Sequence, residues 1–107
     1  MATKAHTDTV DIIIEMAGYG IGYWTSSAVI DTDARTYTVT EEANGATHVL
    51  TDTMIHKALR EAAKEHPAAK ATLREYRARE EFIGGELGSD DADTIIQLAA
   101  LGELVYG

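Results

Sequence analysis

Most of the basic residues gather in the second half of the chain, at a spacing that could bind an anion. Seven of the nine Lys and Arg residues lie between Lys57 and Arg79. Six of them form two sets with helical spacing, which are Lys57, Arg60 and Lys64, and then Lys70, Arg74 and Arg77. Each set would lie along one side of its own helix, and a hairpin across Pro67 would let both sets converge on one groove. Because Lys and Arg bind phosphate well, these six residues are our candidate site for a nucleotide-like anion.

The same basic side chains could instead form surface ion pairs with nearby acidic residues such as Glu61 and Glu75. Exposed ion pairs contribute only about 0.2–1 kcal/mol each and imply no function. The sequence leaves both interpretations open, with more weight on surface pairing.

The net charge of -9 is unevenly distributed. The stretch from Lys57 to Arg79 has seven basic and three acidic residues, a net of +4, while the remainder has two basic and fifteen acidic residues, a net of -13. An acidic surface repels duplex phosphates over a Debye length of about 8 Å. We therefore expect no general nucleic-acid binding.

Four aromatic residues stand beside glycines at the ends of two apolar segments, and they are our candidates for an interface or pocket. They are Tyr19, Tyr23, Trp24 and Tyr106. Tyr and Trp are enriched in interface cores, so we expect a homo-oligomer. Packing inside the protein's own core would explain the same positions equally well.

The glycines at 18, 20 and 22 could form an anion-binding turn, but they do not match a dinucleotide-binding loop. That loop needs the spacing G-x-G-x-x-G between a strand and a helix. Here strands follow the glycines, so the pattern favours a close-packed exit from a helix.

No pattern predicts catalysis, a metal ion or a cofactor. Asp31, Asp33 and Glu42 imitate part of a calcium loop, but Arg35 stands where another ligand is needed. There is no cysteine, and the four histidines lack the i,i+4 pairing of a helical zinc site. No G-x-S-x-G motif surrounds a serine. We expect a protein that is not an enzyme and that has no metal or cofactor.

The apolar periodicity predicts one α+β domain over residues 1–107, with the order αβββααα: an N-terminal helix, a three-stranded antiparallel meander, then two to three helices. Asp8–Tyr19 is predicted as a helix capped by Thr7 or Asp8, although its β-branched run also fits a strand. The remaining elements are expected as strands at Trp24–Ile30, Thr36–Glu41 and Thr47–Thr51, and as helices from Asp52 to about His66, from Pro67 to about Phe82, and over Ala92–Leu101. Asn44-Gly45 predicts a tight hairpin turn.

Two segments of the chain align without gaps, Asp11–Trp24 and Asp93–Tyr106. They could derive from a duplication, or they could be two similar apolar helices that share a core. The second explanation has more weight, since amphipathic helices that end in glycine look alike.

The chain offers no stretch near the ~20 apolar residues of a membrane span, and Met1–Val10 lacks the pattern of a signal peptide. Together with the absence of cysteine, this predicts a cytoplasmic protein that does not contact a membrane.

Three segments resemble short acidic proteins of unassigned activity from actinobacterial tailed phages. They are Ala17–Trp24 (AGYGIGYW), Thr36–Glu42 (TYTVTEE) and Asp91–Gly107 (DADTIIQLAALGELVYG). The similar layout spans most of the chain, and the basic middle is its least similar part. The resemblance implies an accessory protein made in the host cytoplasm and assigns no catalytic residue. Small proteins of this class act by binding.

From these observations we expect a host-takeover or anti-defence protein that sequesters a nucleotide-like signal molecule or blocks a host defence protein. Two alternatives remain. One is an acidic DNA mimic, suggested by the net charge of -13 outside the stretch from Lys57 to Arg79, and the other is a virion assembly protein.

Overall fold

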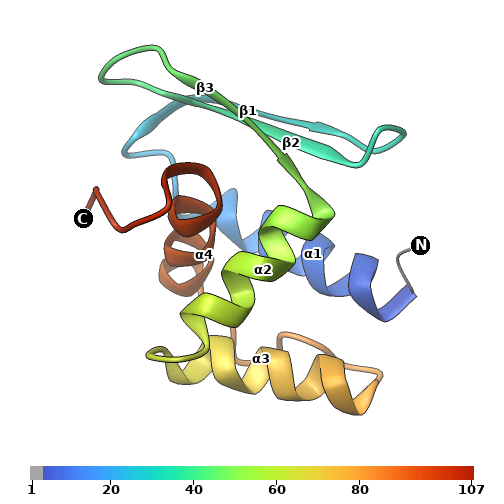
Figure 1. The fold of residues 1–107 in the computed structure, drawn as a ribbon. Helices are drawn as coiled ribbons and strands as arrows, with labels where there is room; N and C mark the ends of the chain where they lie inside the picture. The colour runs from blue at the N-terminus through green and yellow to red at the C-terminus, as the bar shows by residue number, and fades with distance from the viewer. Residues whose placement is uncertain (1–3) are drawn as a thin grey trace.

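The computed structural model describes residues 4–107 and has the predicted α+β architecture (Figure 1). The elements are α1 (Lys4–Ala17), β1 (Thr25–Asp31), β2 (Thr36–Glu41), β3 (Thr47–Thr51), α2 (Asp52–Ala62), α3 (Pro67–Ala78) and α4 (Ser89–Leu101). The predicted order αβββααα is confirmed. Residues 1–3 lie outside the described residues, and they are part of Met1–Val10, the segment in which we expect no signal peptide.

The three strands form one antiparallel sheet in the order β1-β2-β3. The turn between β1 and β2 is held by Asp31, whose carboxylate accepts the backbone N–H groups of Asp33 and Ala34 at 3.1 and 3.0 Å. The turn between β2 and β3 contains Asn44 and Gly45, and Gly45 has a φ of 71°. Glycine adopts this left-handed conformation without a steric penalty, so the predicted hairpin follows from the local sequence.

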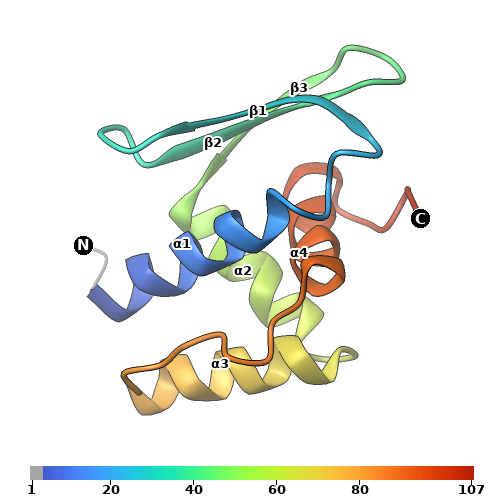
Figure 2. The same cartoon turned by 180° about the vertical axis from the view of Figure 1, so that it is seen from behind.

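The sheet forms one layer and the helices form a second layer on one face of it (Figures 1 and 2). Tyr37, Val39 and Leu50 point from the sheet into the core and are buried. The helical side contributes two buried pairs of isoleucines, Ile13 with Ile14 and Ile95 with Ile96. These pairs belong to the two aligned segments, which therefore share one core.

The helices leave part of the inner face of the sheet uncovered. Alternate residues of a strand point to opposite faces, and Ala28 and Ile30 lie opposite the buried Val39 and Tyr37 in the register. They nevertheless are exposed, as are all residues of β1 after Thr25. β1 thus extends beyond the helical layer.

Five helix boundaries differ from those predicted, and two of them are the end of α1 at Ala17 rather than Tyr19 and the start of α4 at Ser89 rather than Ala92. α1 begins at Lys4 rather than at Thr7 or Asp8, and an ion pair between Lys4 and Asp8 at 2.7 Å spans its first turn. α2 ends at Ala62 rather than near His66, because Pro67 disfavours a helical residue before it and His66 is extended, with ψ at 115°. α3 ends at Ala78 rather than near Phe82, because Arg79 takes a left-handed conformation with φ at 56°.

The glycine-rich segment after α1 is a tight turn that packs on the start of α4. The backbone N–H groups of Gly18, Gly20 and Ile21 donate to carbonyl groups of α1, at 2.9 to 3.1 Å. These groups are therefore not free to bind an anion. A methyl group at Gly20 would overlap the backbone carbonyl of Ser89, whereas one at Gly22 would meet no atom within 4 Å.

This difference predicts the effects of two matched substitutions. Gly20→Ala is expected to lower the free energy of unfolding by about 1–3 kcal/mol, because the backbone of α4 must move. Gly22→Ala is expected to change it by less than about 1 kcal/mol. Chemical denaturation of both variants measures this, and equal losses at the two positions would contradict the packing described.

Candidate functional site

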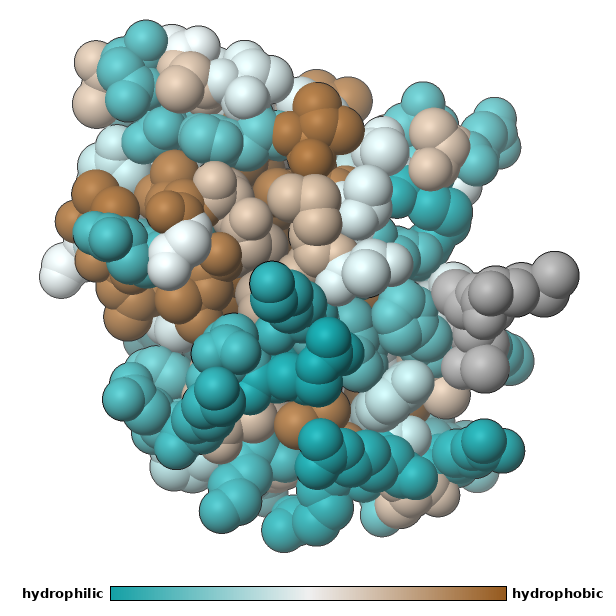
Figure 3. All heavy atoms as spheres, viewed as in Figure 1, coloured by the Kyte–Doolittle hydropathy of each residue, from teal (hydrophilic) through white to brown (hydrophobic). Residues whose placement is uncertain are grey.

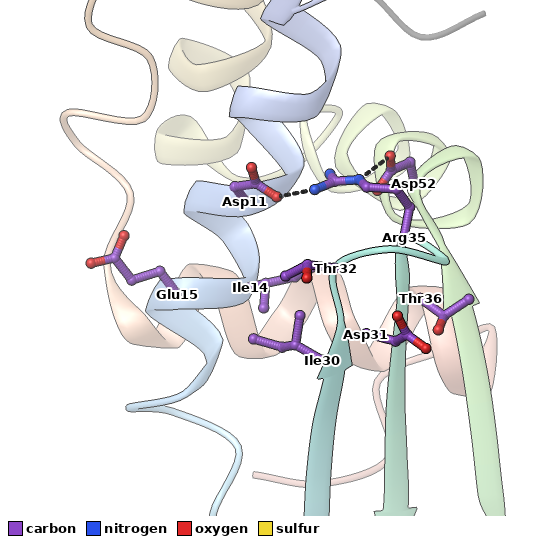
Figure 4. Close-up of a pocket in the computed structure, with 9 residues that line it drawn as sticks. All are labelled: Asp11, Ile14, Glu15, Ile30, Asp31, Thr32, Arg35, Thr36 and Asp52. Atoms are coloured by element: carbon purple, nitrogen blue, oxygen red, sulfur yellow. Dashed lines mark hydrogen bonds and ion pairs between the residues drawn. The ribbon is translucent and has the colours of Figure 1, made fainter.

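A hollow of about 330 Å³ lies between α1 and the end of the sheet where β1 turns into β2 (Figure 4). Ile14 of α1 and Ile30 of β1 face each other across it. The lining residues are Asp11, Ile14, Glu15, Ile30, Asp31, Thr32, Arg35, Thr36 and Asp52. The hollow therefore combines an apolar centre with charged groups around it.

Regular secondary structure fixes these positions. Asp11, Ile14 and Glu15 are three and four residues apart and so share one face of α1. Ile30 is 55% exposed because β1 extends beyond the helices. The hollow is thus a direct consequence of the incomplete cover of the sheet.

Arg35 links three elements at one end of the hollow. Its Nε and Nη2 atoms donate to the two carboxylate oxygens of Asp52, the first residue of α2, both at 2.9 Å. Its Nη1 atom lies 2.8 Å from a carboxylate oxygen of Asp11 on α1. The hydrogen bond to Asp52, followed by the one to Asp11, raises the pKa of Arg35. The backbone of Arg35 has a φ of 55°, a left-handed conformation rare for residues other than glycine.

The hollow has an excess of negative charge. Four acidic residues and one guanidinium are among the lining residues, which gives a net charge of -3 when all are ionised. Asp11 and Asp52 contact Arg35, the Asp31 carboxylate accepts hydrogen bonds within its own turn, and the side chain of Glu15 points away from the hollow (Figure 4). Arg35 already donates to two of those carboxylates and does not offer an open anion site. A cation with an aliphatic stem fits this lining, since the stem would contact Ile14 and Ile30 while the charge meets carboxylate oxygens.

The six basic residues predicted to bind an anion are all exposed, and none of the three hollows described here contains more than one of them. Lys57 lies on the side of α2 that faces α4, and Lys64 lies in the turn after α2, next to the same surface. Arg60 lies on another side of α2, where its Nη1 atom is 3.0 Å from Nδ1 of His56. Lys64 pairs with Glu61 at 3.1 Å, as the surface-pairing interpretation predicts.

Lys70, Arg74 and Arg77 belong to α3, and Arg77 is close enough to His56 for its charge to act on that ring. Arg60 and Arg77 therefore approach each other from α2 and α3. Lys57 and Lys64 do not join them, because they lie beside the surface between α2 and α4. Lys70, Arg74 and Arg77 share one helix as predicted, but Lys64 lies beyond the end of α2, and Lys57 and Arg60 belong to different surfaces.

A second concave surface runs between α2 and α4, where Lys57 and Lys64 lie. Two adjoining hollows of about 440 and 350 Å³ share Glu61, Leu98 and Gly102. Figure 3 shows apolar residues over α4 and the C-terminal segment, next to hydrophilic residues of α2. Leu104 and Val105 contribute to this apolar area, at 50% and 55% exposure.

Three of the four predicted aromatic residues meet in one cluster. The rings of Trp24 and Tyr106 stack, with centroids 5.2 Å apart and planes 10° apart. The Tyr106 hydroxyl donates to Glu41 at 2.6 Å, and Asp93 accepts hydrogen bonds from the Trp24 indole at 2.8 Å and the Tyr23 hydroxyl at 2.5 Å. Desolvation, followed by the hydrogen bond to Asp93, raises the pKa of Tyr23 to about 12.

The buried side chain of Gln97 completes this cluster. Its Oε1 atom accepts the backbone N–H groups of Val105 and Tyr106, both at 2.9 Å, and its Nε2 atom donates to the Tyr106 carbonyl at 3.1 Å. The cluster thus holds the segment after α4 against the core. Tyr19 lies outside it and is 79% exposed.

His56 is buried between His6, Tyr76 and the side chain of Arg60. Its ring centroid lies 4.5 Å from that of His6 and 4.3 Å from that of Tyr76. An arginine can only donate, so Nδ1 of His56 accepts and the proton of the neutral ring is on Nε2, which has no hydrogen-bond partner among the described residues. Burial, followed by the nearby charges of His6, Arg60 and Arg77, lowers the pKa of His56 to about 4.

Among residues 4–107, no group of three or more His, Asp or Glu side chains is placed to hold a metal ion. Within the same range, no helix combines the length and apolar character that a bilayer span requires. Comparisons of the chain with known protein families, with curated proteins and with solved structures found no match. Function therefore has to be inferred from the geometry of this chain.

The hollow beside α1 was not predicted from the sequence. The available signal was Arg35, which is the only Lys or Arg between Lys4 and Lys57 in a strongly acidic stretch. Such an isolated cation indicates carboxylates that need a partner.

The geometry at Arg35 predicts unequal effects of two neutral substitutions. Asp52→Asn is expected to lower the free energy of unfolding by about 1.5–3 kcal/mol, because the side chain of Asp52 is only 14% exposed and accepts two hydrogen bonds. Asp11→Asn is expected to cost about 0.2–1 kcal/mol, because Asp11 is 54% exposed. Denaturation at low salt measures both, and a larger loss at Asp11 would contradict this assignment.

The low pKa of His56 predicts a loss of stability in mild acid. In the unfolded chain His56 binds a proton near the ordinary histidine pKa of 6.5, whereas in the folded chain it does so only near 4. Stability from this residue is therefore present above pH 6.5 and is lost as the pH falls towards 4.

NMR titration of the His56 ring should give a pKa close to the lower value. His56→Phe keeps an aromatic ring but cannot titrate, so its stability should fall less than that of the wild type between about pH 7 and about pH 5. A measured pKa at or above the ordinary value for histidine would contradict the buried neutral state.

Proposed function

We propose that this chain is a non-enzymatic binding protein whose hollow beside α1 receives a cationic side chain of a partner protein. The observation that carries the proposal is the lining of the hollow, where Ile14 and Ile30 face each other and acidic residues outnumber the single cation by four to one. Lys and Arg have an aliphatic stem and a cationic end, and they match both parts of this lining.

The charge of the residues that line the hollow supports a cation rather than an anion as the bound group. Arg35 is the only cation of the hollow, and Asp11 and Asp52 already accept its hydrogen bonds. The overall charge of -9 would also attract a basic partner at long range and speed its association.

The resemblance to phage accessory proteins adds the proposal that the partner is a host protein, which the chain blocks by occupying its basic surface. Sequestration of a nucleotide has less support, because Lys57 and Lys64 lie apart from Arg60 and Arg77. DNA mimicry, virion assembly and homo-oligomer formation remain predictions from the sequence.

The proposal predicts selective binding of a small cationic probe. In an NMR titration, n-butylguanidinium should shift the methyl signals of Ile14 and Ile30, with weak affinity. The neutral control n-butylurea has nearly the same shape, and the anionic control butyrate has the opposite charge. Neither should shift these signals at the same concentration, since neither pairs with carboxylates.

Asp11→Asn should weaken binding of n-butylguanidinium about two- to fivefold, because Asp11 is 54% exposed and its ion pair with the probe is partly screened. Equal shifts with n-butylurea, or shifts confined to residues outside the hollow, would contradict the proposed function.

A further inference from the structure

β1 has a free edge. The strand order β1-β2-β3 leaves β1 paired with β2 alone. In the part of the chain that the structure describes, no backbone hydrogen bond outside the regular helices and strands involves residues 26–31. The outward N–H and C=O groups of an edge strand are a template for pairing with another strand.

The sequence of β1 gives this edge little protection. Edge strands are commonly guarded by lysine, proline or a bulge that twists the edge away. β1 reads TSSAVID, with no lysine or proline, one charge at its end and an irregular register only between Thr25 and Ser27. The stretch from Ser27 to Ile30 is regular and exposed. β3, the other edge strand, contacts α2 and α4.

The acidic hollow lies along the free edge of β1. Figure 4 shows β1 as the strand nearest to α1, with Ile30 pointing towards Ile14 across the hollow. A strand added to β1 would continue the sheet beside β1, on the side of the hollow. Because side chains alternate along a strand, every second side chain of the added strand would point into the hollow, and the others would lie beside Val29 on the outer face.

We propose that an extended segment of the partner protein adds to β1 as a fourth strand and places a Lys or Arg side chain in the hollow. This inference rests on the proposed function and specifies how the partner binds. The backbone of the segment would pair with β1, and its basic side chain would lie over Ile14 and Ile30 and meet Asp11 at the end of the hollow.

The charges favour a different protein over a second copy of this chain as the source of that strand. β1 contains no basic residue, so the β1 of a second copy would bring no cation to the hollow. Two copies would also bring together two acidic hollows on chains with a net charge of -9 each. A basic segment of another protein has the complementary charge.

The test uses the full chain and a displayed library of random seven-residue peptides, the length of β1. Selected peptides are expected to carry Lys or Arg, with β-branched residues around it. One peptide is then synthesised with a single N-methyl group at each backbone position in turn. If the peptide binds as a strand, methylation should weaken binding about tenfold at every second position and little at the positions between, because only alternate N–H groups face β1.

Two further measurements locate the peptide. The amide hydrogens of residues 26–31 that face outward should exchange more slowly in the complex. Asp11→Asn should weaken binding, whereas Glu42→Gln, which neutralises an exposed carboxylate in the β2–β3 turn, should leave it unchanged.

The outcomes separate the two proposals. Basic peptides that are sensitive to Asp11→Asn but show no alternation with N-methylation would overturn strand addition and leave the proposed function standing. A selection that yields no peptide, or only peptides without basic residues, would overturn both. Slow exchange of residues 26–31 in the free chain at raised protein concentration would show that a second copy occupies the edge and would overturn a foreign strand as its partner.

Discussion

The guanidinium of Arg35 is the interaction on which the arrangement of the candidate site depends. It joins the turn between β1 and β2 to Asp11 on α1 and to Asp52 at the start of α2. α1 packs mainly on the other helices, so this contact sets how the exposed end of the sheet lies over it. The left-handed backbone of Arg35 costs on the order of 1–3 kcal/mol, which the hydrogen bonds of its side chain offset.

The open space beside this contact follows from the shape of the sheet. Tyr37, Val39 and Leu50 cover the core, but Ile30 extends past it and leaves apolar surface next to carboxylates. A partner that buries Ile30 removes that apolar area from water, and a cationic side chain compensates the excess charge. The free edge of β1 supplies backbone partners in the same place, so one extended basic segment satisfies all three features.

Local sequence predicted the fold well where local chemistry determines it. The alternation of apolar residues and threonines over Thr36–Glu41 and the turn pair Asn44-Gly45 specify a hairpin, and Pro67 separates two helices as predicted.

The site was harder to predict, since Asp52 follows Arg35 by 17 residues and only the turn, the sheet and α2 together bring them into contact. Likewise, Lys57 and Arg60 lie on α2 as predicted, but α2 ends before Lys64, and the positions of α3 and α4 decide which surface each residue joins. Three predicted aromatics came together because Gln97 fixes the segment after α4, a contact that no local pattern specifies.

The central claim is that a basic strand lies against β1 and over the hollow, and the most direct measurement is the NMR structure of the chain bound to a selected basic peptide. The account predicts nuclear Overhauser contacts between the peptide backbone and that of residues 26–31, together with contacts from the stem of a Lys or Arg side chain to the methyl groups of Ile14 and Ile30. Contacts that lie instead on the surface between α2 and α4, with none to β1, would contradict it.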